Sequence, residues 1–193
     1  MESEIVSKSF KESIKTKERF FTKKNTALVV QTAELIVRAF KAGGKLLIVG
    51  NGGSAADAQH LAAEFVNRFE IERPPLPALA LTTDTSNLTS IGNDYAFDQT
   101  FSKQVRALGK ESDILLAIST SGNSPNVLKA VETAKSLGIK TVALTGKGGG
   151  ALADMADILL NVDSKTTARI QETHITICHI LCELTDHMLF QKV

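Results

Sequence analysis

Short apolar runs alternate with segments of helical periodicity from about residue 45 onward. The runs are continuous rather than alternating in polarity, as expected for strands that are buried on both faces of a parallel sheet. Most of them are followed by glycine, serine or threonine and then by a helical pattern, which predicts an α/β fold with a doubly wound, five-stranded parallel sheet flanked by helices. The predicted strands cover residues 46–49, 78–81, 114–118, 141–144 and 158–162.

Ahead of the first strand, residues 5–42 have a helical pattern that divides into two pieces. Asn25 or Thr26 is the predicted N-cap of the second piece, because either side chain can accept a hydrogen bond from a first-turn amide. We therefore expect an N-terminal helical extension over residues 1–42 and a single α/β unit over residues 43–193. In such sheets ligands bind beyond the carboxyl ends of the strands, so function is expected in the loops there.

The loop after the first predicted strand joins a glycine turn to a polar helix face. Its sequence, Gly50–Ser54, leads into a helix that carries His60 and Glu64. Glycines let main-chain amides approach a ligand closely, and the helix N-terminus adds a partial positive charge, so a phosphate group would be favoured there. His60 and Glu64 are four residues apart and share one helix face, where both could act on the same small molecule.

Two other interpretations of this loop remain open. Gly50, Gly52 and Ala55 match the dinucleotide-binding fingerprint, and Asp84 follows the next strand where a ribose-binding acid could lie, although the spacing is longer than that motif requires. His60 and Glu64 could also be no more than a solvated ion pair on a helix, which has little energetic consequence.

The loop after the third predicted strand, Ser119–Ser124, is rich in hydroxyl groups and precedes another helix. Hydroxyl donors without a lysine favour a sugar phosphate over a nucleotide triphosphate, which calls for the lysine of a P-loop. The alternative is that a serine only caps the helix, a task that needs one such residue. Two further loops are less informative: Gly92–Tyr95 is polar but could be an ordinary turn, and Thr145–Gly150 has no assigned role.

Composition favours a metabolic protein. The 193 residues are 43% hydrophobic, which is enough for a sizeable core, and 22 basic against 21 acidic residues argue against nucleic acid as a ligand. No long apolar run follows the acidic N-terminus, so we expect no signal peptide, no membrane partner and a cytoplasmic location. Cys178 and Cys182 cannot build a disulfide framework and are predicted to be reduced core residues.

Together these motifs resemble the phosphoheptose isomerases, which are sugar isomerase (SIS) domain proteins with a flavodoxin-like sheet. The resemblance covers nearly the whole chain and rests on the two loops, on the His60 and Glu64 pair, and on Arg169–Glu172 with His179. It implies an aldose-ketose isomerase that converts sedoheptulose 7-phosphate to D-glycero-D-manno-heptose 7-phosphate through an enediol. This is the first step toward the ADP- or GDP-heptose of lipopolysaccharide and related surface glycans. A homotetramer with active sites at subunit interfaces is also implied.

Residue by residue, the resemblance makes Glu64 and His179 the acid/base pair. It also implies one zinc ion per subunit, held by His60, Glu64, Gln171 and His179. Gln171 and His179 are about 12 Å apart along an unbroken helix, near the limit at which two side chains can converge on one ion. The residues that the resemblance places on the substrate are Asn51, Gly52, Gly53, Glu64, Asn93, Asp94, Ser119, Thr120, Ser121, Ser124 and Gln171.

Two functions from other classes remain alternatives. The DnaA initiator-associating protein is a non-enzymatic relative that shares these loops but lacks the residues corresponding to Glu64 and His179. Because both are present here, we expect an enzyme. A regulatory SIS module would bind a sugar phosphate without turning it over, so a turnover assay separates it from an isomerase.

Overall fold

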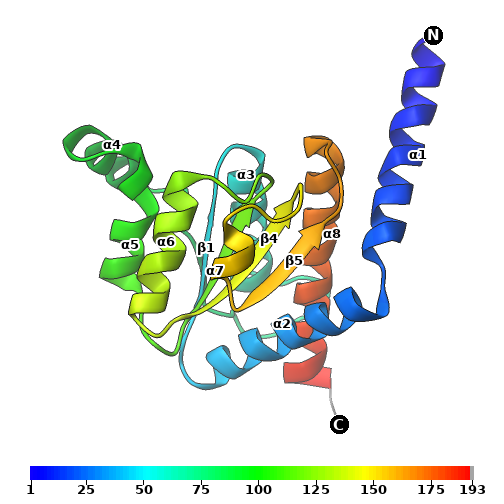
Figure 1. Ribbon diagram of the computed structural model, residues 1–193. Helices are drawn as coiled ribbons and strands as arrows, with labels where there is room; N and C mark the ends of the chain where they lie inside the picture. Colours follow the sequence, from blue (N-terminus) through cyan, green and yellow to red (C-terminus); the bar gives the residue numbers. More distant parts are fainter. Residues whose placement is uncertain (192–193) are drawn as a thin grey trace.

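The computed structural model describes residues 1–191, which form a parallel sheet with helices on both faces (Figure 1). The strand order is β2-β1-β3-β4-β5, and every neighbouring pair is parallel. The order reverses beside β1, as it does in flavodoxin-like sheets. The predicted fold class is therefore confirmed, and each strand boundary lies within two residues of its expected place. The strands are β1 (Leu46–Gly50), β2 (Ala78–Ala80), β3 (Ile114–Ser119), β4 (Lys140–Gly146) and β5 (Ile158–Val162).

Helices bury both faces of the sheet, which explains why the strands are continuously apolar. In β1, Leu46 and Ile48 pack in one core with the first group of helices, while Leu47 and Val49 pack in the opposite core with the second group. The first group consists of α2 (Lys23–Lys41), α3 (Gly53–Val66) and α8 (Thr167–Asp186). The second consists of α5 (Thr100–Leu108), α6 (Pro125–Ser136) and α7 (Leu152–Met155), and α8 continues into a π-helical turn, His187–Gln191.

The N-terminal segment forms two helices, α1 (Glu2–Phe20) and α2. The expected N-cap of α2 is wrong by a few residues: Thr22 caps this helix, and its hydroxyl accepts a hydrogen bond from the Asn25 amide at 3.2 Å. Asn25 instead donates its side-chain amide to the Phe20 carbonyl at 2.9 Å, which closes the turn between the helices. Helix α2 packs on α8, whereas the N-terminal half of α1 projects from the body (Figure 1).

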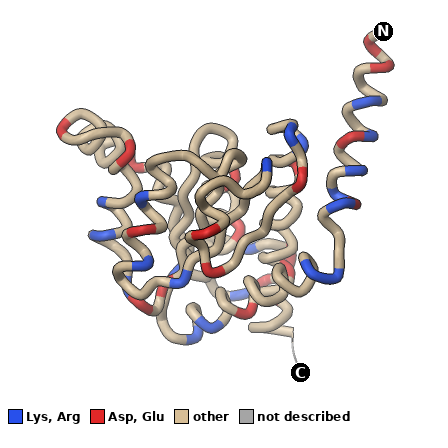
Figure 2. Tube along the Cα trace, viewed as in Figure 1, with Lys and Arg blue, Asp and Glu red and all other residues tan. Residues whose placement is uncertain are grey.

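Charged residues of both signs are spread along the part of the chain that the structure describes. Figure 2 shows basic and acidic residues interspersed along α1 and over the body. Over residues 1–191, no helix combines the length and the apolar character needed to cross a membrane. Cys178 and Cys182 are buried and free, as predicted.

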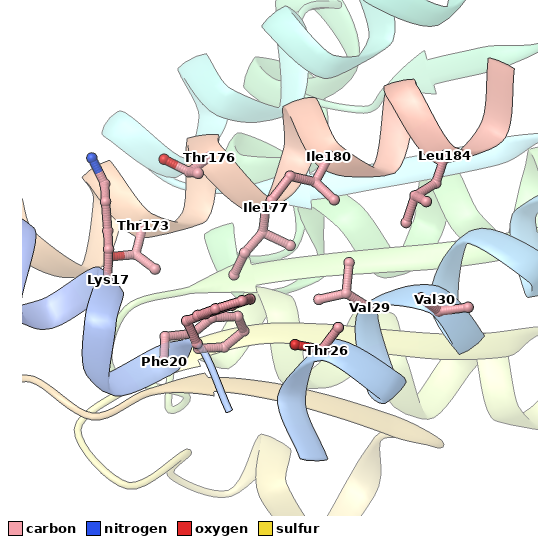
Figure 3. Close-up of a pocket in the computed structure, with 11 residues that line it drawn as sticks. Lys17, Phe20, Thr26, Val29, Val30, Thr173, Thr176, Ile177, Ile180 and Leu184 are labelled. Carbon is pink, nitrogen blue, oxygen red and sulfur yellow. The ribbon is translucent and has the colours of Figure 1, made fainter. Parts of the chain in front are cut away.

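An apolar pocket of about 320 Å³ lies where the end of α1 meets α2 and α8 (Figure 3). Phe20, Val29 and Ile177 point into it from the three helices. It lies on the side of α8 that meets α2, whereas the polar residues predicted to be functional lie where α8 meets α3.

Candidate active site

The two predicted anion-binding loops lie side by side at the carboxyl edge of the sheet. β1 and β3 are neighbours in register, with Gly50 opposite Ile118, so the loops that follow them leave the sheet together. Asn51 in the first loop is hydrogen-bonded to Asn126 at the start of α6, in both directions, at 2.9 Å. Two segments that are far apart in the sequence therefore form one polar surface.

In the first loop, glycines permit close approaches that other residues would prevent. Gly52 has a φ of 55° and starts α3 with no side-chain cap, so the positive end of the helix is left for a ligand. A Cβ atom on Gly53 would overlap the side-chain amide of Gln171, which comes from α8. The predicted substrate residues Gly52, Gly53 and Gln171 are thus next to one another.

In the second loop, the serine hydroxyls face one another. Ser119 Oγ lies 3.1 Å from Ser124 Oγ and 3.5 Å from Ser121 Oγ. Ser124 is the N-cap residue of α6, yet its hydroxyl makes no hydrogen bond to a first-turn amide. The simple capping interpretation is therefore wrong for this serine. Thr120 is half-buried beside the cluster, so the loop presents several hydroxyl groups together.

The loop after β4, to which no role was assigned from the sequence, packs against the serine loop. Lys147 and the three glycines after it, through Gly150, all have φ between 53° and 94°, so the chain doubles back sharply. The Asn123 side chain accepts a hydrogen bond from the Ala151 amide at 2.9 Å. A Cβ atom on Gly122, whose φ is 66°, would overlap the carbonyl oxygen of Gly149.

Gly122→Ala should therefore displace the serine loop. Its methyl group meets main-chain atoms, which cannot move aside as a flexible side chain could, and its φ is unfavourable for alanine. We expect a loss of about 1–3 kcal/mol in the free energy of unfolding and weaker binding of sugar phosphate. Gly92→Ala is the matched control, because a Cβ atom there meets no atom within 4 Å. Equal denaturation midpoints for the two variants would contradict this prediction.

The third expected loop is not a loop. Gly92, Asn93 and Asp94 form the last residues of α4 (Thr85–Asp94), because Asp84 caps this helix and accepts a hydrogen bond from the Asn87 amide at 2.9 Å. This hydrogen bond engages the Asp84 carboxylate, which is the acidic group that the dinucleotide interpretation requires for binding a ribose. Asn93 and Asp94 are exposed, and Asn93 donates to Asp94 at 2.8 Å. Helix α4, which carries these two predicted substrate residues, packs on α5 and projects from the body on the side away from α8 (Figure 1).

The predicted acid/base residues converge where α3 meets α8. His60 Nε2 lies 2.9 Å from His179 Nε2 and 3.4 Å from Glu64 Oε1. One of the two ring nitrogens must carry the proton that the other accepts. The ring of Phe69 stacks on His179 with a centroid separation of 5.6 Å. Two imidazoles and a carboxylate, separated by up to 119 residues, thus form one group that can exchange protons.

Half-buried Asp57 of α3 and fully buried His174 of α8 have shifted pKa values. Burial raises the pKa of Asp57 from 3.8 to about 6, and nearby His60 opposes the shift. Burial lowers the pKa of His174 from 6.5 to about 4, opposed by its hydrogen bond to the Thr145 carbonyl. His174 is therefore neutral at pH 7 and donates through Nε2 at 3.0 Å, because a carbonyl can only accept.

His174 should make the fold sensitive to acid. Because its folded-state pKa is lowered, the unfolded chain binds the extra proton, and stability is lost progressively as pH falls from about 6.5 to about 4. Between pH 7 and pH 4 the wild type should lose about 3 kcal/mol more than His174→Gln does, measured by urea unfolding. The raised pKa of Asp57 has the opposite effect on stability as pH falls, but Asp57 is present in both proteins, so its contribution cancels in the comparison. His187→Gln is the control and should lose as much as the wild type; equal losses in all three proteins would disprove this role.

The donor set suits zinc chemically, but the side chains are not arranged as the ligands of a tetrahedral ion. Among residues 1–191, no three His, Cys, Asp or Glu side chains are arranged to hold a metal ion. The two ring nitrogens, 2.9 Å apart, are closer than the roughly 3.3 Å between nitrogen ligands of a tetrahedral zinc ion. Gln171 packs against Gly53, about 10 Å along α3 from His60. His60, Glu64 and His179 therefore come together, and Gln171 lies toward the glycine loop.

Arg73 is a residue with a role at this site that sequence reasoning missed. It is buried, and its guanidinium donates to Asp186 of α8 at 2.9 Å and to the carbonyls of Glu64 at 2.9 Å and Phe65 at 2.6 Å. These contacts fix the end of α3 that carries Glu64 against α8. In the sequence Arg73 lies in a proline-rich connector, where no periodic signal marks an arginine as buried.

Comparison with known proteins assigns the family. The chain matches the SIS domain family over residues 9–146. It is 59% identical to the phosphoheptose isomerase of Nitratidesulfovibrio vulgaris strain Hildenborough over 182 residues, which cover 94% of this chain and 87% of that relative. This chain belongs to the phosphoheptose isomerase family. The resemblance inferred from the loop motifs is thereby confirmed.

Solved phosphoheptose isomerases have the same fold. The structure from Neisseria gonorrhoeae superposes with a TM-score of 0.91 at 50% identity, covering 96% of this chain and 99% of that one. The structure from Francisella tularensis gives 0.93 at 46% identity, covering 97% and 99%. Both comparisons cover nearly the whole of this chain, so the shared fold extends over almost its full length.

Proposed function

We propose that this protein interconverts sedoheptulose 7-phosphate and D-glycero-D-manno-heptose 7-phosphate. The observation that carries the proposal is the convergence of Glu64, His60 and His179, in a chain more than half identical to a phosphoheptose isomerase. The two loops predicted to bind an anion lie at the same edge of the sheet. The product would supply ADP- or GDP-heptose for surface glycans. A cytoplasmic reaction is part of the proposal, because the substrate is a phosphorylated sugar.

In this mechanism the Glu64 carboxylate takes a proton from C1 of the ketose. His179 donates a proton to the O2 oxygen as the C2 carbonyl becomes the hydroxyl of the enediol, and it then accepts the proton of the O1 hydroxyl. Glu64 returns its proton to C2, which leaves an aldehyde at C1, so no atom is gained or lost. The contact between His179 and His60 orients the ring for this exchange.

Substrate length supports this arrangement. The eight bonds from C1 to the phosphorus atom of an extended heptose 7-phosphate span roughly 10 Å, at about 1.2 Å per bond of an extended chain. Seven residues of α3 separate Gly53 from His60, which is also about 10 Å. A phosphate at the N-terminal end of α3 would therefore leave C1 within reach of the proton-transfer group.

We also propose that zinc, when bound, is held by His60, Glu64 and His179, with Gln171 as the fourth ligand after its side chain turns toward them. Such an ion polarises a carbonyl oxygen and stabilises negative charge that develops on it. Metal analysis of the purified protein tests this directly. We expect about one zinc per chain in the wild type and less than half of that in His60→Ala. Equal zinc contents in the two proteins would rule out this ligand set.

A homotetramer is the proposed assembly. Helix α1 exposes a row of large apolar side chains, including Phe10 at 69% and Ile14 at 55%, and an isolated helix of this length is only marginally stable in water. The apolar pocket between α1, α2 and α8 (Figure 3) extends this surface. Light scattering should give four times the 20.7 kDa chain mass. Phe10→Glu should reduce that mass, whereas Lys8→Glu should not, and an unchanged mass for Phe10→Glu would contradict a role for α1.

Turnover decides between the candidate functions. Incubation with sedoheptulose 7-phosphate should give the aldose, detected by chromatography or by reaction of the free aldehyde. Binding without turnover would favour a regulatory SIS module, and the absence of both would leave only a non-enzymatic role such as binding the initiator DnaA. The presence of Glu64 and His179 in contact with the same imidazole favours turnover.

A further inference from the structure

Asn126 has a contact that neither the motifs nor the comparisons connect with function. It lies in the first turn of α6 and is only 2% exposed. Its Nδ2 donates to Asn51 Oδ1 at 2.9 Å, and Asn51 Nδ2 donates to Asn126 Oδ1 at 2.9 Å. The two side-chain amides thus form a closed pair of hydrogen bonds across 75 residues of sequence.

This closed pair restricts the orientation of Asn51. A side-chain amide has two N–H donors and an oxygen with two lone pairs, and the pair uses one N–H and one lone pair of each residue. If Asn51 alone turned by half a rotation, its amino group would face the amino group of Asn126, and oxygen would face oxygen. Because Asn126 is buried, water cannot readily replace the lost partners. Asn51 therefore presents its remaining N–H and lone pair in fixed directions.

The same contact links the two anion-binding loops. Asn51 follows β1 within the glycine loop, and Asn126 stands two residues after Ser124 of the serine loop. The backbone of α6 is held by buried Val127 and Val131 in the core, so Asn126 is a rigid support for the more exposed Asn51. A change at Asn126 would therefore alter the position of the Asn51 side chain.

We propose that Asn126 is a positioning residue that sets the orientation of the Asn51 amide toward the sugar phosphate. The inference rests on the proposed function, because it takes Asn51 as a substrate contact. It predicts that Asn126 matters for turnover only while Asn51 is present.

A double-mutant cycle tests this dependence. We expect Asn126→Ala and Asn51→Ala each to lower kcat/KM by about 10- to 100-fold, as small misplacements of substrate contacts do. The double variant should lose no more than the worse of the two single variants, because both remove the same oriented amide. Losses that multiply in the double variant would show that Asn126 does not act through Asn51 and would overturn the proposal.

Thr141→Val is the matched control for a purely structural loss. Thr141 is also buried and hydrogen-bonded, to Asp157 at 2.8 Å, but it lies at the opposite, amino-terminal edge of the sheet. The Thr141→Val variant should be less stable than the wild type and should keep the wild-type kcat/KM. If Asn126→Ala behaved in the same way, Asn126 would be structural and the proposal would fail.

Asn126→Asp provides a second test, which remains informative if Asn126→Ala does not fold. A protonated carboxyl group has one O–H donor and one acceptor, so it can replace the amide in the closed pair, whereas a carboxylate cannot donate to Asn51 Oδ1. The ratio of variant to wild-type kcat/KM should therefore fall about tenfold as pH rises through the pKa of the new carboxyl, which burial raises. A ratio that does not change with pH would overturn the proposal.

Failure of the proposed function would be distinguishable from failure of this inference. Wild-type turnover of sedoheptulose 7-phosphate tests the function alone. If the wild type does not turn the sugar over, calorimetric binding of the same compound to the wild type and the three cycle variants still measures the coupling. Non-additive losses of affinity would support the role of Asn126, and unchanged affinity in Asn126→Ala would overturn it.

Discussion

Glu64→Gln should lower kcat by about 10²- to 10⁴-fold, the usual contribution of a positioned general base, and leave the fold intact. Glutamine has nearly the same shape but cannot take the C1 proton. Glutamine is also neutral, and the Glu64 side chain is 22% exposed, so the substitution should cost little stability. His179→Ala should have a similar effect because it removes the group that moves the hydroxyl protons. Both are measured as steady-state turnover of sedoheptulose 7-phosphate, with circular dichroism to verify folding.

Two matched controls lie in α8 and in the π-helical turn that follows it. Glu183→Gln and His187→Ala make the same chemical changes at exposed positions that are outside the candidate site. Both should retain wild-type kcat. Normal turnover in Glu64→Gln or in His179→Ala would refute the assigned role of that residue.

Arg73→Met should destabilise the protein by about 3–5 kcal/mol, the range for removing one partner of a buried ion pair. The side chains of Arg73 and Asp186 are 1% and 5% exposed, so loss of the guanidinium leaves an unpaired buried carboxylate. It also leaves the carbonyls of Glu64 and Phe65 without that donor. Urea unfolding measures the loss, and Arg73→Met/Asp186→Leu should recover part of it because no charge is then left unpaired.

Arg68→Met is the control for this prediction. Arg68 pairs with Glu72 at 3.7 Å, but the side chains are 50% and 90% exposed, and exposed pairs contribute little. The change should therefore be within about 1 kcal/mol. If Arg73→Met were as mild as Arg68→Met, Arg73 would not be the residue that fixes α3 against α8.

Elements with local signals were predictable from the sequence. The strands were predictable because burial on both faces requires continuous apolar runs. The positions of the two loops were predictable because glycines and hydroxyl residues follow those runs directly, and binding of an anion by these loops stays a prediction. His60 and Glu64 were paired by helical spacing alone, and they are 3.4 Å apart in the structure. No local spacing connects His179 with this pair, and only the resemblance to phosphoheptose isomerases predicts that it belongs to the same site.

The polar loop expected at Gly92–Tyr95 shows where local signals fail. Glycine, asparagine and aspartate favour turns, but the Asp84 cap and the packing of α4 on α5 continue the helix to Asp94. The N-cap of α2 was misplaced for a similar reason, because several neighbouring residues can cap and only the path of the chain between α1 and α2 selects Thr22.

By itself, the sequence determined the layered α/β fold and the residue types of the two loops at the carboxyl edge of the sheet, since each leaves a local pattern along the chain. The tertiary structure alone decided that His60 faces His179, that Asn51 pairs with Asn126, that the loop after β4 supports the serine loop and that Arg73 fixes the end of α3. These contacts join segments distant along the chain, so their partners depend on how the strands and helices are packed and leave no periodic pattern in the sequence.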